Sequence, residues 1–193
     1  MPKLLSVKGP LRNTNNRLRV QWNMGNSCNY SCEYCPPILH DGSKPWFNKQ
    51  VYIDTIDRLN VHYTALNKVL DYELIGGEVT VIPGFEDIIR RIHESGARSM
   101  VFTNGGRTIN WWSKAKYYLD GIVYTYHPLS QDKEHFKAVL NEIKDYVHID
   151  INIAGIGGRV DELGVLVEEI RELFVDCKRN TYDNVSVCVK TMY

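Results

Sequence analysis

The sequence has no excess of charge of either sign and no long apolar run. Its 23 Lys and Arg residues balance its 23 Asp and Glu residues, so the formal net charge at pH 7 is zero. Because phosphate contacts usually demand a basic excess, this balance argues against a surface for duplex nucleic acid. No apolar run approaches the roughly 18 residues of a membrane span, and the first residues are too short an apolar stretch for a secretory signal. We therefore expect a cytoplasmic protein without a membrane partner.

Internal repeats, low-complexity tracts and a clear interdomain linker are also missing. The 193 residues are enough for one domain with a sizeable core, and hardly enough for two. A content of 44% hydrophobic and 24% charged residues is that of an ordinary globular protein. We therefore expect residues 1–193 to form a single domain.

The chain alternates strand-like runs with helix-like segments. The strand-like runs span residues 17–25, 68–78, 98–106, 121–128, 147–155 and 184–193. The helix-like segments span residues 48–67, 84–96, 108–119, 130–146 and 160–173, with Ser130 as the expected cap of the fourth. This alternation predicts parallel strands joined by right-handed crossovers, with functional residues at the carboxyl ends of the strands.

Several of the strand-like runs are apolar on one face only. A parallel sheet covered by helices on both sides should instead show nearly continuous apolar runs. We therefore predict a partial (β/α)6 TIM-like barrel whose polar strand faces line an open lumen; the alternative is a sheet with one solvated face. A wet, hydrogen-bonding lumen suits a small polar substrate that resembles a nucleotide, a sugar or an amino acid. The residues predicted to line it are Arg19, Gln21, Asn23, Thr125, Asp150, Asn152 and Lys190.

Three of the five cysteines lie within the eight residues CNYSCEYC, directly after the first strand-like run. Disulfides are rare in the cytosol, so clustered cysteines there indicate metal binding or catalysis. Cys28, Cys32 and Cys35 can hold three corners of an iron–sulfur cubane and leave the fourth iron open to a small molecule. The alternatives are a zinc site completed by a histidine such as His40, or free thiols. We expect the two remaining cysteines, Cys177 and Cys188, to pack in the core.

The spacing Cys-x3-Cys-x-aromatic-Cys, with Tyr34 in the aromatic place, resembles the signature of the radical S-adenosylmethionine (SAM) enzymes. The resemblance implies a radical SAM fold and an oxygen-sensitive [4Fe–4S] cluster held by the three cysteines. It also implies that SAM chelates the fourth iron. An electron from a donor such as flavodoxin or ferredoxin would then cleave SAM to a 5′-deoxyadenosyl radical that abstracts hydrogen from the substrate.

Other segments resemble further marks of that family. Residues 76–80, GGEVT, resemble its Gly-Gly-Glu-Pro motif, which implies that Gly76, Gly77 and Glu78 bind SAM, with Val79 in place of the proline. Residues 103–106, TNGG, are similar to its Thr-Asn-Gly. Residues 151–158, INIAGIGG, match its adenine-binding pattern at two positions and depart from it at two others. The further cofactor contacts that the resemblance implies, in the cysteine loop, in these segments and at the end of the fourth strand-like run, are Tyr34, Asn104, Thr125, His127, Ile153 and Gly155.

Two of these expectations have ordinary alternatives. His127 is equally compatible with a satisfied core or loop histidine. The chain as a whole is also compatible with an activase that installs a glycyl radical on a partner protein, or with a non-catalytic iron–sulfur or zinc protein. The leading prediction is a minimal, core-only radical SAM enzyme acting on a small molecule. The motifs indicate only how the reaction is initiated, and they name neither the substrate nor a catalytic residue.

Overall fold

The computed structural model describes residues 6–8, 16–155, 160–177 and 186–191. They contain a seven-stranded sheet in which the strands lie side by side in chain order. The strands β2 to β7 are parallel, and the short β1 pairs with β2 in the antiparallel direction. The strands are β1 (Ser6–Lys8), β2 (Arg17–Asn23), β3 (Val69–Ile75), β4 (Arg98–Thr103), β5 (Gly121–Tyr126), β6 (His148–Gly155) and β7 (Ser186–Thr191).

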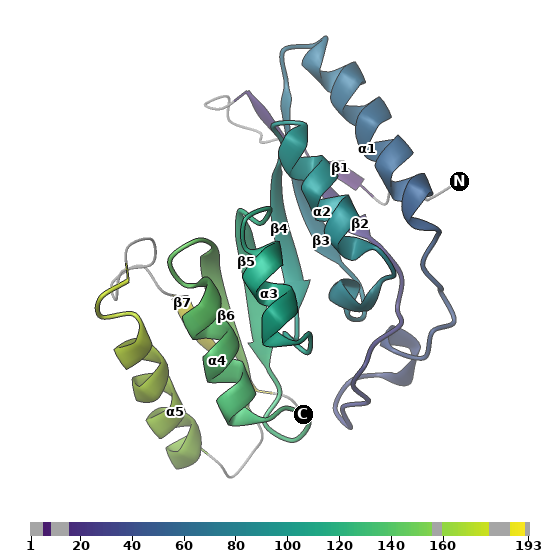
Figure 1. Ribbon diagram of the computed structural model, residues 1–193. Helices are drawn as coiled ribbons and strands as arrows, with labels where there is room; N and C mark the ends of the chain where they lie inside the picture. The colour runs from purple at the N-terminus through teal and green to yellow at the C-terminus, as the bar shows by residue number, and fades with distance from the viewer. Residues whose placement is uncertain (1–5, 9–15, 156–159, 178–185, 192–193) are drawn as a thin grey trace.

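Five α-helices connect the parallel strands, and all five lie on the same face of the sheet (Figure 1). They are α1 (Lys49–Thr64), α2 (Phe85–Glu94), α3 (Ile109–Ala115), α4 (Lys133–Ile143) and α5 (Val160–Leu173). Two single-turn 3-10 helices, η1 (Pro37–Leu39) and η2 (Val79–Val81), follow the carboxyl ends of β2 and β3. The six predicted strands and five predicted helices are therefore confirmed, with ends that are shorter by a few residues. None of the described helices combines the length and the apolar character that crossing a bilayer requires.

The hydrophobic core lies between the helices and the sheet. Alternation along β2 buries Val20 and Trp22 against the helices and leaves Gln21 exposed on the opposite face. On α2, the apolar side chains at positions 85, 88, 89 and 92 are all buried, as the helical spacing predicts. The predicted arrangement of one helix-covered face and one open face is confirmed, and we call the open face the lumenal face.

Three local features differ from the sequence-based expectations. The cap of α4 is Asp132, whose side chain accepts a hydrogen bond from the His135 N–H at 2.6 Å, and not Ser130. The strand β1 was not predicted, because three residues carry too little periodicity. Cys177 is buried in the core as expected, whereas Cys188 is exposed, because its position on β7 alternates with the half-buried Val187.

Candidate functional site

The three cysteines lie on the segment between β2 and α1, residues 24–48, which we call the cysteine loop. Hydrogen bonds from Asn26 join the beginning of this loop to its second half. The Asn26 amide nitrogen donates to the Ile38 carbonyl and to an Asp41 carboxylate oxygen, both at 2.7 Å, and its oxygen accepts from the Lys44 N–H at 2.8 Å. An isolated antiparallel bridge between Ser27 and Asp41 lies beside this contact. Because Asn26 is buried, these bonds replace lost hydration and hold both ends of the loop together.

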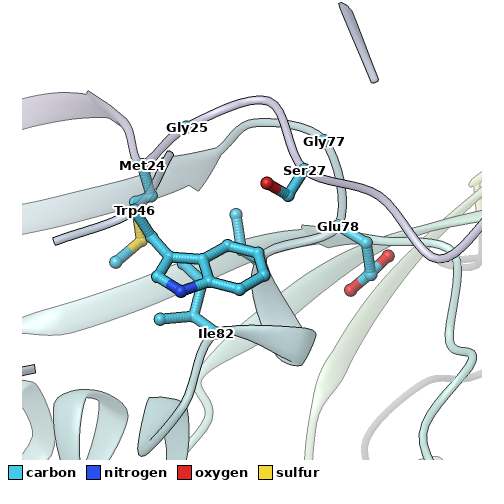
Figure 2. Close-up of a pocket in the computed structure, with 8 residues that line it drawn as sticks. Met24, Gly25, Ser27, Trp46, Gly77, Glu78 and Ile82 are labelled. Carbon is cyan, nitrogen blue, oxygen red and sulfur yellow. The ribbon is translucent and has the colours of Figure 1, made fainter. Parts of the chain in front are cut away.

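The segment after β3 runs directly against the start of the cysteine loop. Gly77 N–H donates to the Gly25 carbonyl at 3.0 Å, and Glu78 N–H donates to the Ser27 carbonyl at 2.9 Å. A Cβ atom on Gly76 would lie 2.5 Å from the Gly25 oxygen, and one on Gly77 would lie 2.3 Å from the Ser27 oxygen. The two glycines are therefore required by the close approach of two backbones. Figure 2 shows this contact, with the Trp46 indole filling the space beneath it.

The Glu78 carboxylate ties the end of β3 to the end of β4. One oxygen accepts hydrogen bonds from the Thr80 N–H at 3.0 Å, the Thr80 hydroxyl at 2.5 Å and the Thr103 hydroxyl at 2.8 Å. The other oxygen accepts from the Asn104 N–H at 2.6 Å. Burial raises the pKa of this carboxyl, and the donated hydrogen bonds oppose that rise. The side chain is 1% exposed, so contact with a ligand amino group stays a prediction.

Asn104 lies between the Glu78 carboxylate and the cysteine loop. Its amide nitrogen donates to the Asn29 side-chain oxygen at 2.8 Å and approaches the Cys28 sulfur at 3.8 Å. Its carbonyl accepts from the side chain of Gln131, which also donates to the Tyr124 hydroxyl and accepts from the His127 N–H. The structure thus brings the predicted residues Glu78 and Asn104 together next to the first cysteine.

The second cysteine contacts residues that follow β5. The Cys32 sulfur lies 3.3 Å from the Ser130 hydroxyl and 3.7 Å from His127 Nδ1. The same ring nitrogen is hydrogen bonded to the Tyr34 hydroxyl, and the two rings are stacked with an interplanar angle of 8°. Burial lowers the pKa of His127 to about 4, which keeps the imidazole neutral near pH 7. His127 thus contacts the cysteine loop, and Tyr34 packs on it, whereas a contact of either residue with a cofactor stays a prediction.

The three thiols lie close enough to interact electrostatically. Burial raises the pKa of the Cys28 thiol, a hydrogen bond from the Tyr30 N–H opposes the rise, and negative charge at Glu78, Cys32 and Cys35 adds to it. Among the described residues, no three His, Cys, Asp or Glu side chains converge as the ligands of one metal ion. A cubane binds each thiolate through a different iron, so it needs a wider arrangement than a single ion does.

The predicted substrate residues that the structure describes lie on the lumenal face. Arg19 pairs with Glu73 at 3.1 Å, and Gln21 donates to the same carboxylate at 3.3 Å. Asp150 lies 3.7 Å from the ring of His148. Asn23 lies on the same face of β2 as Arg19 and Gln21. Thr125 on β5 pairs with Asn152 on β6.

Two predicted cofactor residues lie on the face of β6 that packs in the core. The side chain of one predicted substrate residue lies outside the described residues. Ile153 is fully buried in the hydrophobic core, and Gly155 is buried at the end of the strand. Lys190 lies on β7 beside Ala154, but its side chain lies outside the described residues, as do residues 156–159 of the predicted adenine-binding segment.

Sequence reasoning missed the residues that support the site. Asn26 and Gln131 each join segments that are far apart in the chain, so no local pattern marks them. Asn29, Tyr30 and Ser130 lie inside or beside recognised motifs, but their hydrogen bonds to the loop depend on the folded geometry.

No family model matches the chain, and no curated protein matches it. Among solved structures it is similar to SuiB of Streptococcus suis bound to the precursor peptide SuiA, with a TM-score of 0.64 and 14% identity. This match covers 91% of the chain and 39% of the SuiB chain. SuiB bound to S-adenosylmethionine is also similar, with a TM-score of 0.46, 12% identity, and coverage of 91% and 48%. The first likeness shows the fold: an open sheet of six parallel strands like the radical SAM partial barrel of SuiB.

Proposed function

We propose that this chain is a radical SAM enzyme that acts on a small polar substrate in its lumen. The observation that carries the proposal is the cysteine loop: three thiols on one loop, at the carboxyl end of the first parallel strand of this fold. In parallel α/β architectures that edge is where reactive groups gather. A cytoplasmic location and an electron donor such as flavodoxin or ferredoxin belong to the same proposal.

The residues around the loop fit a [4Fe–4S] cluster held by Cys28, Cys32 and Cys35. Hydrogen-bond donors reach two of the three sulfurs: the Tyr30 N–H lies 3.4 Å from Cys28, and the Ser130 hydroxyl lies 3.3 Å from Cys32. Such outer contacts orient thiolate ligands and stabilise their negative charge. The closed base at Asn26 limits how far the three sulfurs can separate.

When bound, such a cluster would supply the electron for reductive cleavage of SAM, and the resulting 5′-deoxyadenosyl radical would abstract hydrogen from the substrate. The chain's own residues position the reactants. Gly76 and Gly77 allow the β3 loop to approach the cysteine loop, and Glu78 holds Asn104 beside Cys28. The lumenal side chains of β2, β5 and β6 offer hydrogen bonds to the substrate below that edge.

Anaerobic reconstitution tests this function. We expect about four iron and four sulfide per chain, and 5′-deoxyadenosine from SAM when a reductant is added. Replacing Cys28, Cys32 or Cys35 by alanine should abolish both, whereas Cys188→Ser, which removes an exposed thiol outside the loop, should preserve both. A colourless protein, or iron that survives the loss of a loop cysteine, would contradict the proposal.

A further inference from the structure

Three apolar side chains lie next to one another on the lumenal face, near the ends of the strands that approach the cysteine loop. Leu74 pairs with Val101 and Phe102 pairs with Val123, so Ile75, Phe102 and Val123 lie side by side on β3, β4 and β5. We call these three residues the apolar row. Phe102 is 36% exposed, and its two neighbours are half-buried. Because the five described α-helices lie on the other face of the sheet, none of them covers the row (Figure 1).

Polar residues flank the apolar row on both sides at the same level. Asn23 on β2 pairs with Ile75, and Asp150 on β6 pairs with Val123. The Asn23 side-chain oxygen accepts a hydrogen bond from the Gly25 N–H at 3.1 Å. The Asn23 amide nitrogen is therefore the group that can donate a hydrogen bond to a ligand. Neighbouring strands lie about 4.8 Å apart, so the three-strand row is roughly 10 Å wide between its outer two residues. A fused ring system has about this width.

The row lies near the proposed site of reaction. Phe102 precedes Asn104 by two residues, or about 7 Å of strand, and Asn104 contacts Cys28. Toward the amino ends of the strands lies a hollow of about 300 Å³, whose lining residues Met100 and Gly121 precede Phe102 and Val123 by two residues each. The residues that line this hollow include Met100, Gly121, Arg19, Glu73, Arg98 and His148.

We infer that the substrate is a planar ring compound of the nucleobase class, whose face stacks on Phe102. This inference rests on the proposed function and narrows it. An exposed aromatic side chain in a polar wall gains free energy when an apolar face covers it. A sugar offers only a small C–H face between polar edges and covers less of the row than a fused ring does, whereas a lipid offers no hydrogen-bonding edge to Asn23 and Asp150. A flat ring with hydrogen-bonding edges covers the row and meets Asn23 and Asp150.

Calorimetric titration of guanosine and of glucose tests the inference. The protein is reconstituted with its cluster, saturated with SAM and kept without reductant, so that ring binding is measured apart from catalysis. We expect guanosine to bind and glucose not to bind. Phe102→Ala should weaken guanosine binding about 5- to 150-fold, the usual effect of removing a stacked aromatic ring. Phe102→Tyr, which keeps the ring, should stay within about threefold of the unmodified chain.

Two controls separate stacking from a general loss of structure. Tyr117→Ala removes an exposed aromatic ring outside the lumen and should leave guanosine affinity unchanged. Phe102→Leu retains apolar volume without a ring face and should bind guanosine more weakly than the tyrosine variant. Absence of guanosine binding, or equal affinity in the alanine and tyrosine variants, would overturn the inference. Failure of the proposed function would instead show as missing iron or missing SAM binding. The guanosine titration is repeated on cluster-free protein, so that a failure of ring binding is distinguished from a failure to bind the cluster or SAM.

Discussion

The Glu78 carboxylate accepts a hydrogen bond from the Asn104 N–H at 2.6 Å and thereby joins the ends of β3 and β4. Asn104 in turn reaches the Asn29 side chain and the Cys28 sulfur. A single buried carboxylate therefore links two strand ends to the first residue of the cysteine loop. This chain of contacts explains how the sheet sets the position of a loop that has little regular structure of its own.

Glu78→Gln should destabilise the chain even without any cofactor. The glutamine carbonyl can still accept from Thr80 and Thr103, but its amide nitrogen would then face the Asn104 N–H, donor against donor. An unsatisfied buried donor costs about 1–3 kcal/mol, and we expect a loss of that size in urea unfolding of the cluster-free protein. Thr103→Val, which removes only one donor, should cost less. Equal stability of Glu78→Gln and the unmodified chain would show that Asn104 does not depend on the carboxylate.

Gly77→Ala should separate the β3 loop from the cysteine loop. Its Cβ would lie 2.3 Å from the Ser27 oxygen, so one of the two backbones must move. We expect a loss of about 1–3 kcal/mol, as for other overpacked sites, together with lower iron content after reconstitution. Gly164→Ala is the matched control, because nothing lies within 4 Å of the added atom on α5. That variant should be neutral or slightly more stable, since alanine favours helix over glycine.

Asn26→Ala should open the base of the cysteine loop. The substitution leaves the Ile38 carbonyl and the Lys44 N–H without their side-chain partner. We expect faster proteolysis between residues 28 and 43 in the cluster-free protein and faster loss of iron from the reconstituted one. Asn60→Ala breaks a 3.0 Å hydrogen bond to Ser95 elsewhere and serves as the control. Identical cleavage rates in the two variants would mean that Asn26 does not close the loop.

Asp71 should contribute stability that disappears in acid. Burial alone would raise its pKa, but hydrogen bonds from Arg98 and Arg17 outweigh burial and lower it. A carboxyl with a lowered folded-state pKa stabilises the fold above its unfolded value of about 3.9, and the contribution is lost as the pH falls through the folded value.

The measurement is the difference in free energy of unfolding between the unmodified chain and Asp71→Asn across pH. The difference should be on the order of 1–3 kcal/mol at pH 7, the usual worth of charged hydrogen bonds. It should shrink below about pH 4, where the aspartate of the unmodified chain protonates. A difference that does not change with pH would contradict the ion-pair account of this cluster.

Much of the fold could be predicted because local periodicity marks it. The helical stripe around Ile88 and Ile92 and the alternation around Val20 follow directly from which face is buried. The open lumenal face followed from the same alternation, since Gln21 and Asp150 have no place under a covering helix. The cap of α4 was predicted wrongly because Ser130 and Asp132 are both good capping residues, and only the folded chain decides between them.

The site was predicted less completely because its supporting contacts are distant in sequence. Asn26 meets Asp41 and Lys44 across a loop, and Gln131 meets Asn104 across 27 positions. Gly77 was expected to approach a ligand, and the structure shows that it first approaches the Ser27 backbone. Cys188 was placed in the core because cysteine is often buried, but its place in the β7 alternation puts it on the exposed face.

The central claim is that the three loop cysteines leave one iron of a cubane free for SAM. The most direct test is electron paramagnetic resonance of the reduced, reconstituted protein with and without SAM labelled isotopically at its amino nitrogen and carboxylate oxygens. The account predicts that SAM changes the cluster spectrum and that the labelled atoms show hyperfine coupling to it. A cluster spectrum that SAM leaves unchanged, with no coupling to either label, would contradict it.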